Sequence, residues 1–451
     1  MGVWGCGGQR RPARSHTPIR PYAQTFFWVL ALLLLLLWAG TAQAVQRFPR
    51  PQFESGHVLP LTTTPVPRAP ALAYLDLAVL TGALALASWL VLRRRTRTGV
   101  WLLTLFSVAY FGFWRKGCIC PVGSTQNVTL ALFGAGYTIP WTVLAFFLLP
   151  LFTALFFGRT FCAAVCPLGA VQDLFVVRPV RVPPRLAAVL GVLPWVYLGA
   201  ALLLAATGAT FLICRFDPFV GFFRVGANVN LLVWGVALLG LGMIVARPYC
   251  RFLCPYGALL SLAARLAWKH ATITPTTCIR CRLCEDTCPF GSIRAPTPER
   301  APEPPAAARR RLAGLLALLP VLVLVGGWAG ASVSRPLTRL HPTVRTAERV
   351  WLEDTRAVTG TTVESQTFRG TGQTTASLLA DALALRDRFR RGGWILGGLG
   401  GGLLGAALIG LALRRPRTDY TIDQATCLSC ARCFAYCPKD REWRGEKPES
   451  V

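Results

Sequence analysis

Two stretches of this sequence, far apart in the chain, carry the same cysteine pattern. The first reads Cys278-Ile-Arg-Cys281-Arg-Leu-Cys284-Glu-Asp-Thr-Cys288-Pro289, and the second reads Cys427-Leu-Ser-Cys430-Ala-Arg-Cys433-Phe-Ala-Tyr-Cys437-Pro438. In each stretch three closely spaced thiols fall in one tight loop, and the fourth is displaced by the turn before the proline. Two apolar segments separate the stretches, so the number of membrane crossings between them decides whether they can meet.

The spacing C-x2-C-x2-C-x3-C-P is that of bacterial ferredoxins, in which the fourth cysteine of each run ligates the other cluster. The sequence therefore predicts two [4Fe–4S] clusters. The first is assigned to Cys278, Cys281, Cys284 and Cys437, and the second to Cys427, Cys430, Cys433 and Cys288. Zinc sites or disulfides are the alternative, and two complete runs on the reducing side of a membrane favour iron–sulfur over both.

The composition places the chain in a bilayer. Of its 451 residues, 53% are hydrophobic and 15% are charged, and its mean hydropathy is +0.47. A soluble domain carries about 25% charged residues, so a disordered chain, a secreted disulfide miniprotein and an ordinary soluble enzyme are excluded. The net charge of +28 is explained by basic residues in cytoplasmic loops, so a membrane lipid environment and no nucleic-acid partner are expected.

Eight apolar segments approach the length that crosses a hydrocarbon core. They cover residues 26–44, 71–92, 99–114, 138–158, 185–206, 227–246, 312–333 and 393–414. The sequence thus predicts an all-α polytopic membrane protein with about seven or eight transmembrane helices. Most arginine clusters next to these segments fall on one side, which places the ferredoxin motifs in the cytoplasm. Two basic clusters, at residues 115–116 and 386–391, fall on the other side.

The segments divide the chain into regions. Residues 1–44 end in Ala42-Gln43-Ala44 and are predicted to be a signal peptide or a first membrane anchor. An even number of crossings between the two cysteine runs predicts a small ferredoxin module split by a helical hairpin. The further regions are an extracytoplasmic Pro-rich segment 45–70, a membrane domain 71–270, the first ferredoxin half 271–300, a helix 312–333, an extracytoplasmic loop 334–392, a helix 393–414, and the second half with its tail 415–451.

Two further cysteine pairs are predicted at the inner membrane face. They are Cys162-Ala-Ala-Val-Cys166-Pro and Cys250-Arg-Phe-Leu-Cys254-Pro. The i, i+4 spacing places the two thiols of each pair on one helical face. Together the pairs supply four thiolates, enough for a third iron–sulfur cluster or another thiolate metal centre. The alternative is that these cysteines are buried small hydrophobic residues in helix packing.

An altered third copy of this pattern lies earlier in the chain. The stretch Cys118-Ile-Cys120-Pro-Val-Gly-Ser-Thr-Gln126-Asn127 repeats part of Cys166-Pro-Leu-Gly-Ala-Val-Gln172-Asp173. The predicted topology places Cys118, Cys120 and Cys214 near the outer face. They form either a redox centre there, completed by Asp217 or a non-protein ligand, or a disulfide with one thiol left over.

Together these motifs resemble the NosR/NapH-type polytopic membrane 4Fe–4S proteins, over residues 100–295 and 420–440. The resemblance implies a multi-pass protein of the bacterial cytoplasmic (inner) membrane. It would pass electrons between a quinol or cytoplasmic donor and a periplasmic redox enzyme or electron carrier. The chain departs from that type in two ways: residues 45–70 are too few for the periplasmic flavin domain of the NosR type, and two extra helices split the ferredoxin halves.

No pocket with a nucleophile, acid or base, and no P-loop, is evident in the sequence. An electron-transfer component of an oxidoreductase system is therefore expected rather than a stand-alone catalyst. A redox-sensing membrane protein and a thiol-based copper handling or maturation factor are the alternatives. Four histidines and two methionines argue against copper, because soft copper sites combine cysteine with methionine or histidine. The Gly-rich run 397–405 predicts close packing of membrane helices.

Overall fold

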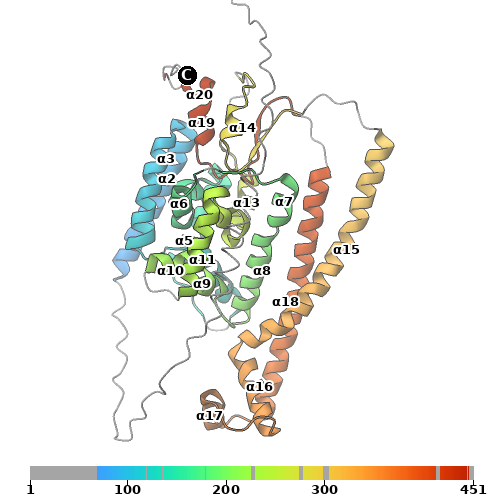
Figure 1. The fold of residues 1–451 in the computed structure, drawn as a ribbon. Helices are drawn as coiled ribbons and strands as arrows, with labels where there is room; N and C mark the ends of the chain where they lie inside the picture. Colours follow the sequence, from blue (N-terminus) through green and yellow to red (C-terminus); the bar gives the residue numbers. More distant parts are fainter. Residues whose placement is uncertain are drawn as a thin grey trace, which may run out of the picture. The chain divides into compact units, whose positions relative to one another are not determined.

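In the computed structural model, the chain divides into two units, and every residue that the structure describes lies in the second, Pro65–Val451. These residues are 69–117, 119–134, 137–177, 179–224, 229–273, 278–297, 304–412, 417–443 and 445. The predicted signal peptide or anchor 1–44, nearly all of segment 45–70, and Cys118 lie outside the described residues. The described part is mostly helical (Figure 1).

Four helical stretches of the described part are long and apolar enough to cross a membrane, and the chain is a membrane protein on this evidence. They cover residues 71–94, 184–206, 306–340 and 375–412. Two shorter apolar helices, α5 (Trp141–Phe157) and α11 (Val229–Ile244), coincide with two other predicted segments. Segment 99–114 is helical as α3 (Arg97–Ser107) and a π-helical turn. The total of seven or eight crossings stays a prediction.

The remaining elements of the membrane domain are helices and helical turns. They are α2 (Pro70–Trp89), α4 (Pro121–Phe133), α6 (Pro167–Leu174), α7 (Pro184–Leu190), α8 (Leu193–Ala206), α9 (Leu212–Phe216), α10 (Pro218–Arg224), α12 (Pro248–Phe252) and α13 (Pro255–Arg265). Three π-helical turns cover Leu90–Arg94, Val108–Trp114 and Phe161–Val165. Many of these helices begin at a proline, because its fixed φ suits the first helical turn and its missing N–H is not needed there.

Helices α15 (Pro305–Leu337) and α18 (Thr375–Ala412) form a hairpin whose backbones touch (Figure 1). A methyl group at Gly330 would meet the carbonyl of Gly393, and one at Gly397 would meet the carbonyl of Gly326. Small residues allow this approach. The predicted role of the glycine run 397–405 is thereby confirmed at its first residue.

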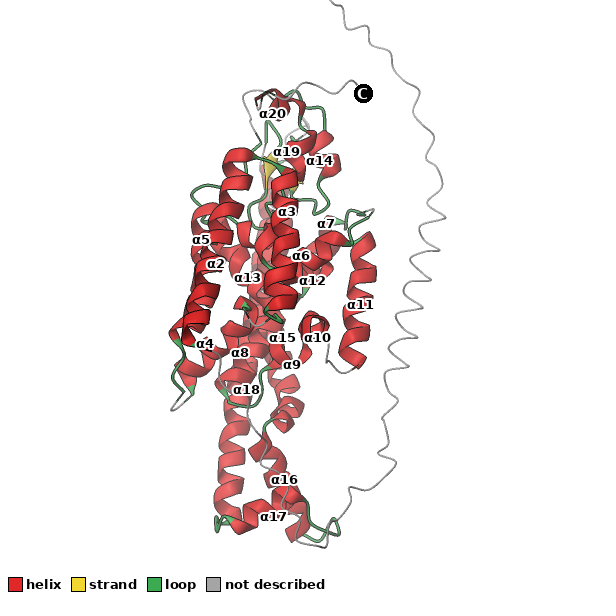
Figure 2. Ribbon diagram, turned by 90° about the vertical axis from the view of Figure 1, so that its left-hand side faces the viewer, coloured by secondary structure: helices red, strands yellow, loops and turns green. Residues whose placement is uncertain are grey.

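The segment between these helices carries a small core of its own. Helices α16 (Pro342–Asp354) and α17 (Val363–Gly370), after a 3-10 turn at Thr338–Leu340, pack on the first turns of α18 (Figure 2). Their buried residues are Val344, Ala347, Val350, Phe368, Leu378 and Ala382. The structure therefore has ordered helices within the predicted loop 334–392.

The two cysteine runs form one small module. Strand β1 (Ile293–Arg294) pairs antiparallel with β2 (Thr421–Ile422), so that Ile293 lies opposite Ile422. The short helices α14 (Leu283–Thr287) and α19 (Arg432–Tyr436) pack on one another, and α20 (Pro438–Trp443) follows. The chain thus brings the two halves together although the α15–α18 hairpin separates them in sequence.

Candidate functional site

The two cysteine runs have the same backbone conformation. In each run, the residues on either side of the second cysteine are in the left-handed region. Their φ angles are 53° (Arg280) and 68° (Arg282) in the first run, and 52° (Ser429) and 60° (Ala431) in the second. Non-glycine residues adopt this conformation at a cost of about 1 kcal/mol or more, and they do so mainly where function constrains the chain. Each loop is therefore wrapped tightly around a central space.

The fourth cysteine of each run turns away from its own loop. Cys288 and Cys437 follow α14 and α19 and are extended, at ψ 107° and 113°, because the next residue is proline. One cavity is lined by Cys278, Cys281, Cys284 and Cys437, and a second by Cys427, Cys430, Cys433 and Cys288. These are the two sets named from the spacing.

Each set of four cysteines fits the thiolate ligation of a 4Fe–4S cluster. Among the described residues, no group of three or more Cys, His, Asp or Glu side chains that could hold a metal ion is found. Burial raises the pKa of Cys284 to about 11 and that of Cys427 to about 12. Bound iron would supply the positive charge that keeps these ligands deprotonated.

The geometry of the two C-x3-C-P pairs differs from the prediction. Cys162 lies in the π-helical turn, whereas Cys166 is extended and precedes α6. Cys250 lies in α12, and Cys254 likewise precedes α13. The prediction that each pair shares one helical face is wrong, because the proline after the second cysteine excludes that cysteine from a helix.

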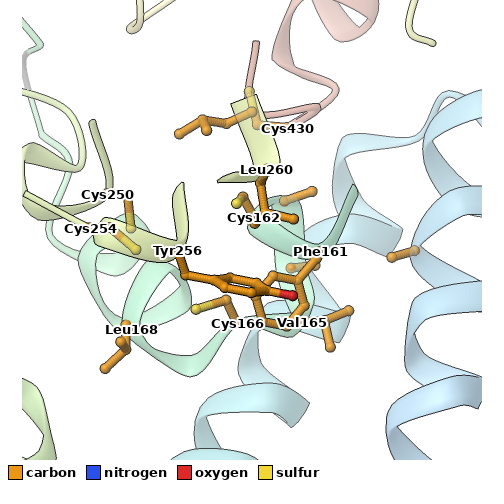
Figure 3. Packing of buried hydrophobic residues seen from close by; sticks show 14 of the residues in the cluster. Phe161, Cys162, Val165, Cys166, Leu168, Cys250, Cys254, Tyr256, Leu260 and Cys430 are labelled. Atoms are coloured by element: carbon orange, nitrogen blue, oxygen red, sulfur yellow. The ribbon is translucent and has the colours of Figure 1, made fainter. Parts of the chain in front are cut away.

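The four thiols nevertheless gather in one buried region. Figure 3 shows Cys162, Cys166, Cys250 and Cys254 around Tyr256, and all four are less than a tenth exposed. Burial raises the pKa of Cys166, and its neighbours Cys250, Cys162 and Cys254 raise it further. Two segments that are distant in the sequence, 162–166 and 250–254, thus contribute one pair of thiols each.

Polar groups surround these thiols. The side-chain amide of Gln172 donates to the Cys250 sulfur at 3.3 Å, and the backbone N–H of Gly257 donates to the Cys254 sulfur at 3.3 Å. The Arg159 guanidinium lies 3.8 Å from the Cys162 sulfur. Hydrogen bonds and charge of this kind tune the potentials of thiolate-bound clusters.

A buried charge network joins this region to the ferredoxin module. The Asp173 carboxylate accepts a hydrogen bond from Arg97 at 2.6 Å and lies 3.4 Å from both Arg247 and Arg432. The side chains of Asp173 and Arg247 are 1% and 0% exposed. Burial alone would raise the pKa of Asp173, but Arg247 and Arg97 hold that pKa well below its usual range. Asp173 is therefore ionised and fully paired.

The same arginines reach both cysteine sites. Arg97 donates to the carbonyl of Cys430 at 3.1 Å, and Arg247 donates to the carbonyls of Cys162 and Ala163. Four other arginines also contact the module. These contacts are Arg95 with Asp440 at 2.5 Å, Arg159 with the carbonyl of Ala425, Arg181 with Asp286, and Arg251 with the carbonyl of Phe290.

The predicted outer-face residues lie elsewhere in the membrane domain. Cys120 and Cys214 both carry free thiols, and a methyl group at Gly123 would lie 3.2 Å from the Cys214 sulfur and 4.0 Å from the Cys120 sulfur. Asp217 is buried near both and raises the pKa of each thiol, after burial itself. The structure thus brings three of the predicted residues together.

Sequence reasoning assigned no role to Asp173, and it explained the arginines around that residue mainly by membrane topology. The available signal was the position of Gln172-Asp173, six and seven residues after Cys166, which Gln126-Asn127 repeats after Cys120. Arg247 gave no separate signal, because an arginine after a membrane segment is ordinary.

Comparison with known proteins identifies the cysteine regions. One model of a 4Fe-4S binding domain matches residues 139–183 and 227–271, which contain the two C-x3-C-P pairs. Another model of a 4Fe-4S binding domain matches residues 271–294, which contain the first ferredoxin run. This chain is an iron–sulfur protein with ferredoxin-type 4Fe-4S domains.

Two relatives match short stretches. An uncharacterized protein of Methanocaldococcus jannaschii is 42% identical over 50 residues, which is 11% of this chain and 20% of that protein. Protein NirI of Paracoccus denitrificans is 40% identical over 63 residues, which is 14% of this chain and 9% of NirI. The chain therefore matches a fifth or less of the length of these relatives. No solved structure matches it. The NosR/NapH type stays a prediction.

Proposed function

We propose that this chain carries electrons across a bacterial cytoplasmic membrane. The donor would be a quinol or a cytoplasmic reductant, and the acceptor a redox partner on the opposite side. The ferredoxin module would lie in the cytoplasm, and the chain would act as one component of an oxidoreductase system. The 4Fe-4S domain matches and the short NirI match support an iron–sulfur electron-transfer role.

The ferredoxin cysteines suggest the order of the centres. The first cluster would be held by Cys278, Cys281, Cys284 and Cys437, and Cys281 of this set is exposed to a donor. The second would be held by Cys427, Cys430, Cys433 and Cys288, and its Cys430 is only 9% exposed. Cys284, Cys288 and Cys433 pack around the same small core. One-electron exchange between adjacent centres of this kind requires no bond to form or break.

The observation that carries the proposal is the junction around Asp173. Arg97 binds the backbone of Cys430, Arg247 binds the backbone of Cys162, and both share the Asp173 carboxylate. The second ferredoxin site and the C-x3-C-P region are therefore joined by one largely buried network. We propose that Cys162, Cys166, Cys250 and Cys254 hold a third iron–sulfur centre, next in line after the second cluster.

Iron analysis tests this arrangement. The full chain is purified without oxygen, and its iron and acid-labile sulfide are compared with those of a variant in which Cys162, Cys166, Cys250 and Cys254 are all Ala. The variant is expected to lose about four irons per chain and keep the EPR signals of the ferredoxin clusters. Unchanged iron would leave these thiols a packing role. A parent protein that contains zinc alone would contradict the whole proposal.

Turnover separates an electron carrier from a redox sensor. In proteoliposomes with the ferredoxin module inside and reduced, external ferricyanide is expected to reoxidise the clusters through the parent protein. The same cysteine variant interrupts the path and should slow reoxidation to the rate of leakage. A sensor would hold its clusters reduced in both preparations.

A further inference from the structure

We infer that Cys120, Cys214 and Asp217 hold an additional iron–sulfur centre, which reproduces three of the four ligand positions of the C-x3-C-P site with a carboxylate at one of them. The inference extends the proposed function by one centre. The altered repeat in the sequence aligns only Cys120 with Cys166. The structure supplies the other correspondences.

Cys120 has the local geometry of the second cysteine in each C-x3-C-P pair. Cys120, Cys166 and Cys254 are extended residues that each precede a proline and occupy the N-cap of a helix, α4, α6 and α13 respectively. The Cys120 and Cys254 sulfurs accept the backbone N–H of the glycine three residues later, at 3.4 Å for Gly123 and 3.3 Å for Gly257. A helix N-terminus and an aligned N–H favour a thiolate at both positions.

Cys214 corresponds to Cys250 in its contacts with the repeat. The Gln172 side-chain oxygen accepts the N–H of Tyr249, the residue before Cys250, at 3.1 Å. The Gln126 side-chain oxygen accepts the N–H of Ile213, the residue before Cys214, at 3.0 Å.

The glycines agree with this correspondence. A methyl group at Gly169 would lie 3.5 Å from the Cys250 sulfur, and one at Gly123 would lie 3.2 Å from the Cys214 sulfur. Gly123 and Gly169, which occupy the same place in the repeat, therefore lie against Cys214 and Cys250 in the same way.

Asp217 then takes the place of Cys254. Cys254 is extended at ψ 111° and precedes the proline that begins α13, and Asp217 is extended at ψ 115° and precedes the proline that begins α10. The sequence Cys250-x3-Cys254-Pro thus has its counterpart in Cys214-x2-Asp217-Pro. Carboxylate oxygen is an accepted ligand for iron.

A buried donor without a partner points to a missing acceptor at this place. The Gln126 side chain is 0% exposed, and its amide nitrogen has no hydrogen-bond partner. The matching nitrogen of Gln172 donates to the Cys250 sulfur. Leaving such a donor unpaired is costly, and a cluster sulfide or a repositioned thiolate would satisfy it.

The location suits electron exchange with a partner. The Tyr249 hydroxyl donates to the Asp217 carboxylate at 3.1 Å, so a residue next to Cys250 joins the two sites. Cys214 is exposed. An electron that leaves the C-x3-C-P centre would oxidise that centre by one unit and reduce this one, and it would then pass to a one-electron redox protein bound at the exposed side.

Iron counts on the full chain test the inference. A Cys120→Ala/Cys214→Ala variant is expected to lose about four irons per chain and keep the signals of the other centres, which also shows that it has folded. Asp381→Asn, an exposed acidic control, should lose none. Unchanged iron in the double variant overturns this inference, even where the C-x3-C-P variant loses its four irons and the proposed function stands.

Replacing the carboxylate by a thiolate gives a second readout. Asp217→Cys gives the site a third thiolate, at the position that Cys254 occupies in the other site, so it is expected to keep the iron and alter the EPR signal of one centre only. Spectra and potentials identical to those of the parent would show that Asp217 is not a ligand and would overturn the assignment.

Discussion

At the level of single residues, Asp173 is the side chain on which the contact between the ferredoxin module and the C-x3-C-P region most depends. It is the carboxylate shared by Arg97, Arg247 and Arg432, and Arg247 is fully buried. Breaking a buried ion pair by removing one partner costs about 3–5 kcal/mol, because the other charge is left in a medium of low polarity.

Asp173→Asn is therefore expected to lower the free energy of unfolding by about 3 kcal/mol or more. Denaturant unfolding in detergent, followed by cluster absorbance, measures the change. Asp419→Asn is the matched control, since its pair with Arg280 is 3.7 Å long and largely exposed. That control should change stability by less than about 1 kcal/mol. Equal losses in the two variants would refute a special role for Asp173.

The decrease in the free energy of unfolding caused by Asp173→Asn should not depend on pH between about 5 and 8. The native pKa of Asp173 is depressed by Arg247 and Arg97. A depressed carboxyl pKa stabilises the fold above the ordinary pKa of about 4, and the contribution is lost only as the pH falls through the native value. Unfolding of parent and variant at pH 5, 6.5 and 8 checks this. A difference that fades by pH 5 would mean that Asp173 is protonated in that range.

At the level of elements, the proline after each key cysteine explains the geometry better than helical spacing does. Cys166 and Cys254 are extended at ψ 116° and 111°, and each caps a new helix. Spacing of i, i+4 predicts a shared helical face only where the helix continues. The residue before a proline is disfavoured in the helical region, so the helix ends between the two cysteines.

The hairpin of α15 and α18 depends on its glycines. Gly330→Ala would place a methyl group against the carbonyl of Gly393, so it is expected to cost about 1–3 kcal/mol. Gly410→Ala in α18 meets nothing within 4 Å and should be neutral or slightly stabilising. Thermal unfolding of the two variants in detergent makes the comparison. A neutral Gly330→Ala would contradict close backbone packing in the hairpin.

At the level of the whole molecule, the topology can be tested by labelling. Val363→Cys in α17, 78% exposed, and Lys439→Cys in α20 introduce thiols at the hairpin tip and in the ferredoxin module. Relative to the parent, an impermeant maleimide should label the first in intact cells and the second only after lysis. Labelling of both in intact cells would refute the predicted sides.

The arginines show which properties can be predicted from the sequence alone. Arg97, Arg159 and Arg247 fit the positive-inside pattern, and that pattern is sufficient to predict their side of the membrane. In the structure the same side chains bind the backbone of Cys430, Ala425 and Cys162. The same arginines therefore follow the positive-inside rule and bind backbone carbonyls of the cysteine sites. Only this binding depends on partners that are distant in the sequence.

The sequence by itself determined the membrane character and the 4Fe-4S chemistry, and it predicted the two sets of ferredoxin thiols. These features follow from hydropathy and from cysteine spacing within runs of eleven residues, where the chain itself limits how far apart the ligands can lie. The even number of apolar segments between the runs was enough to predict that the halves can meet.

Only the tertiary structure decided that Cys162 and Cys166 face Cys250 and Cys254, that Asp173 ties them to the second ferredoxin site, and that Asp217 lies near Cys120 and Cys214. The partners in these contacts are tens to hundreds of residues apart in the chain. Their meeting depends on the packing of several helices at once, and no local spacing limits that distance.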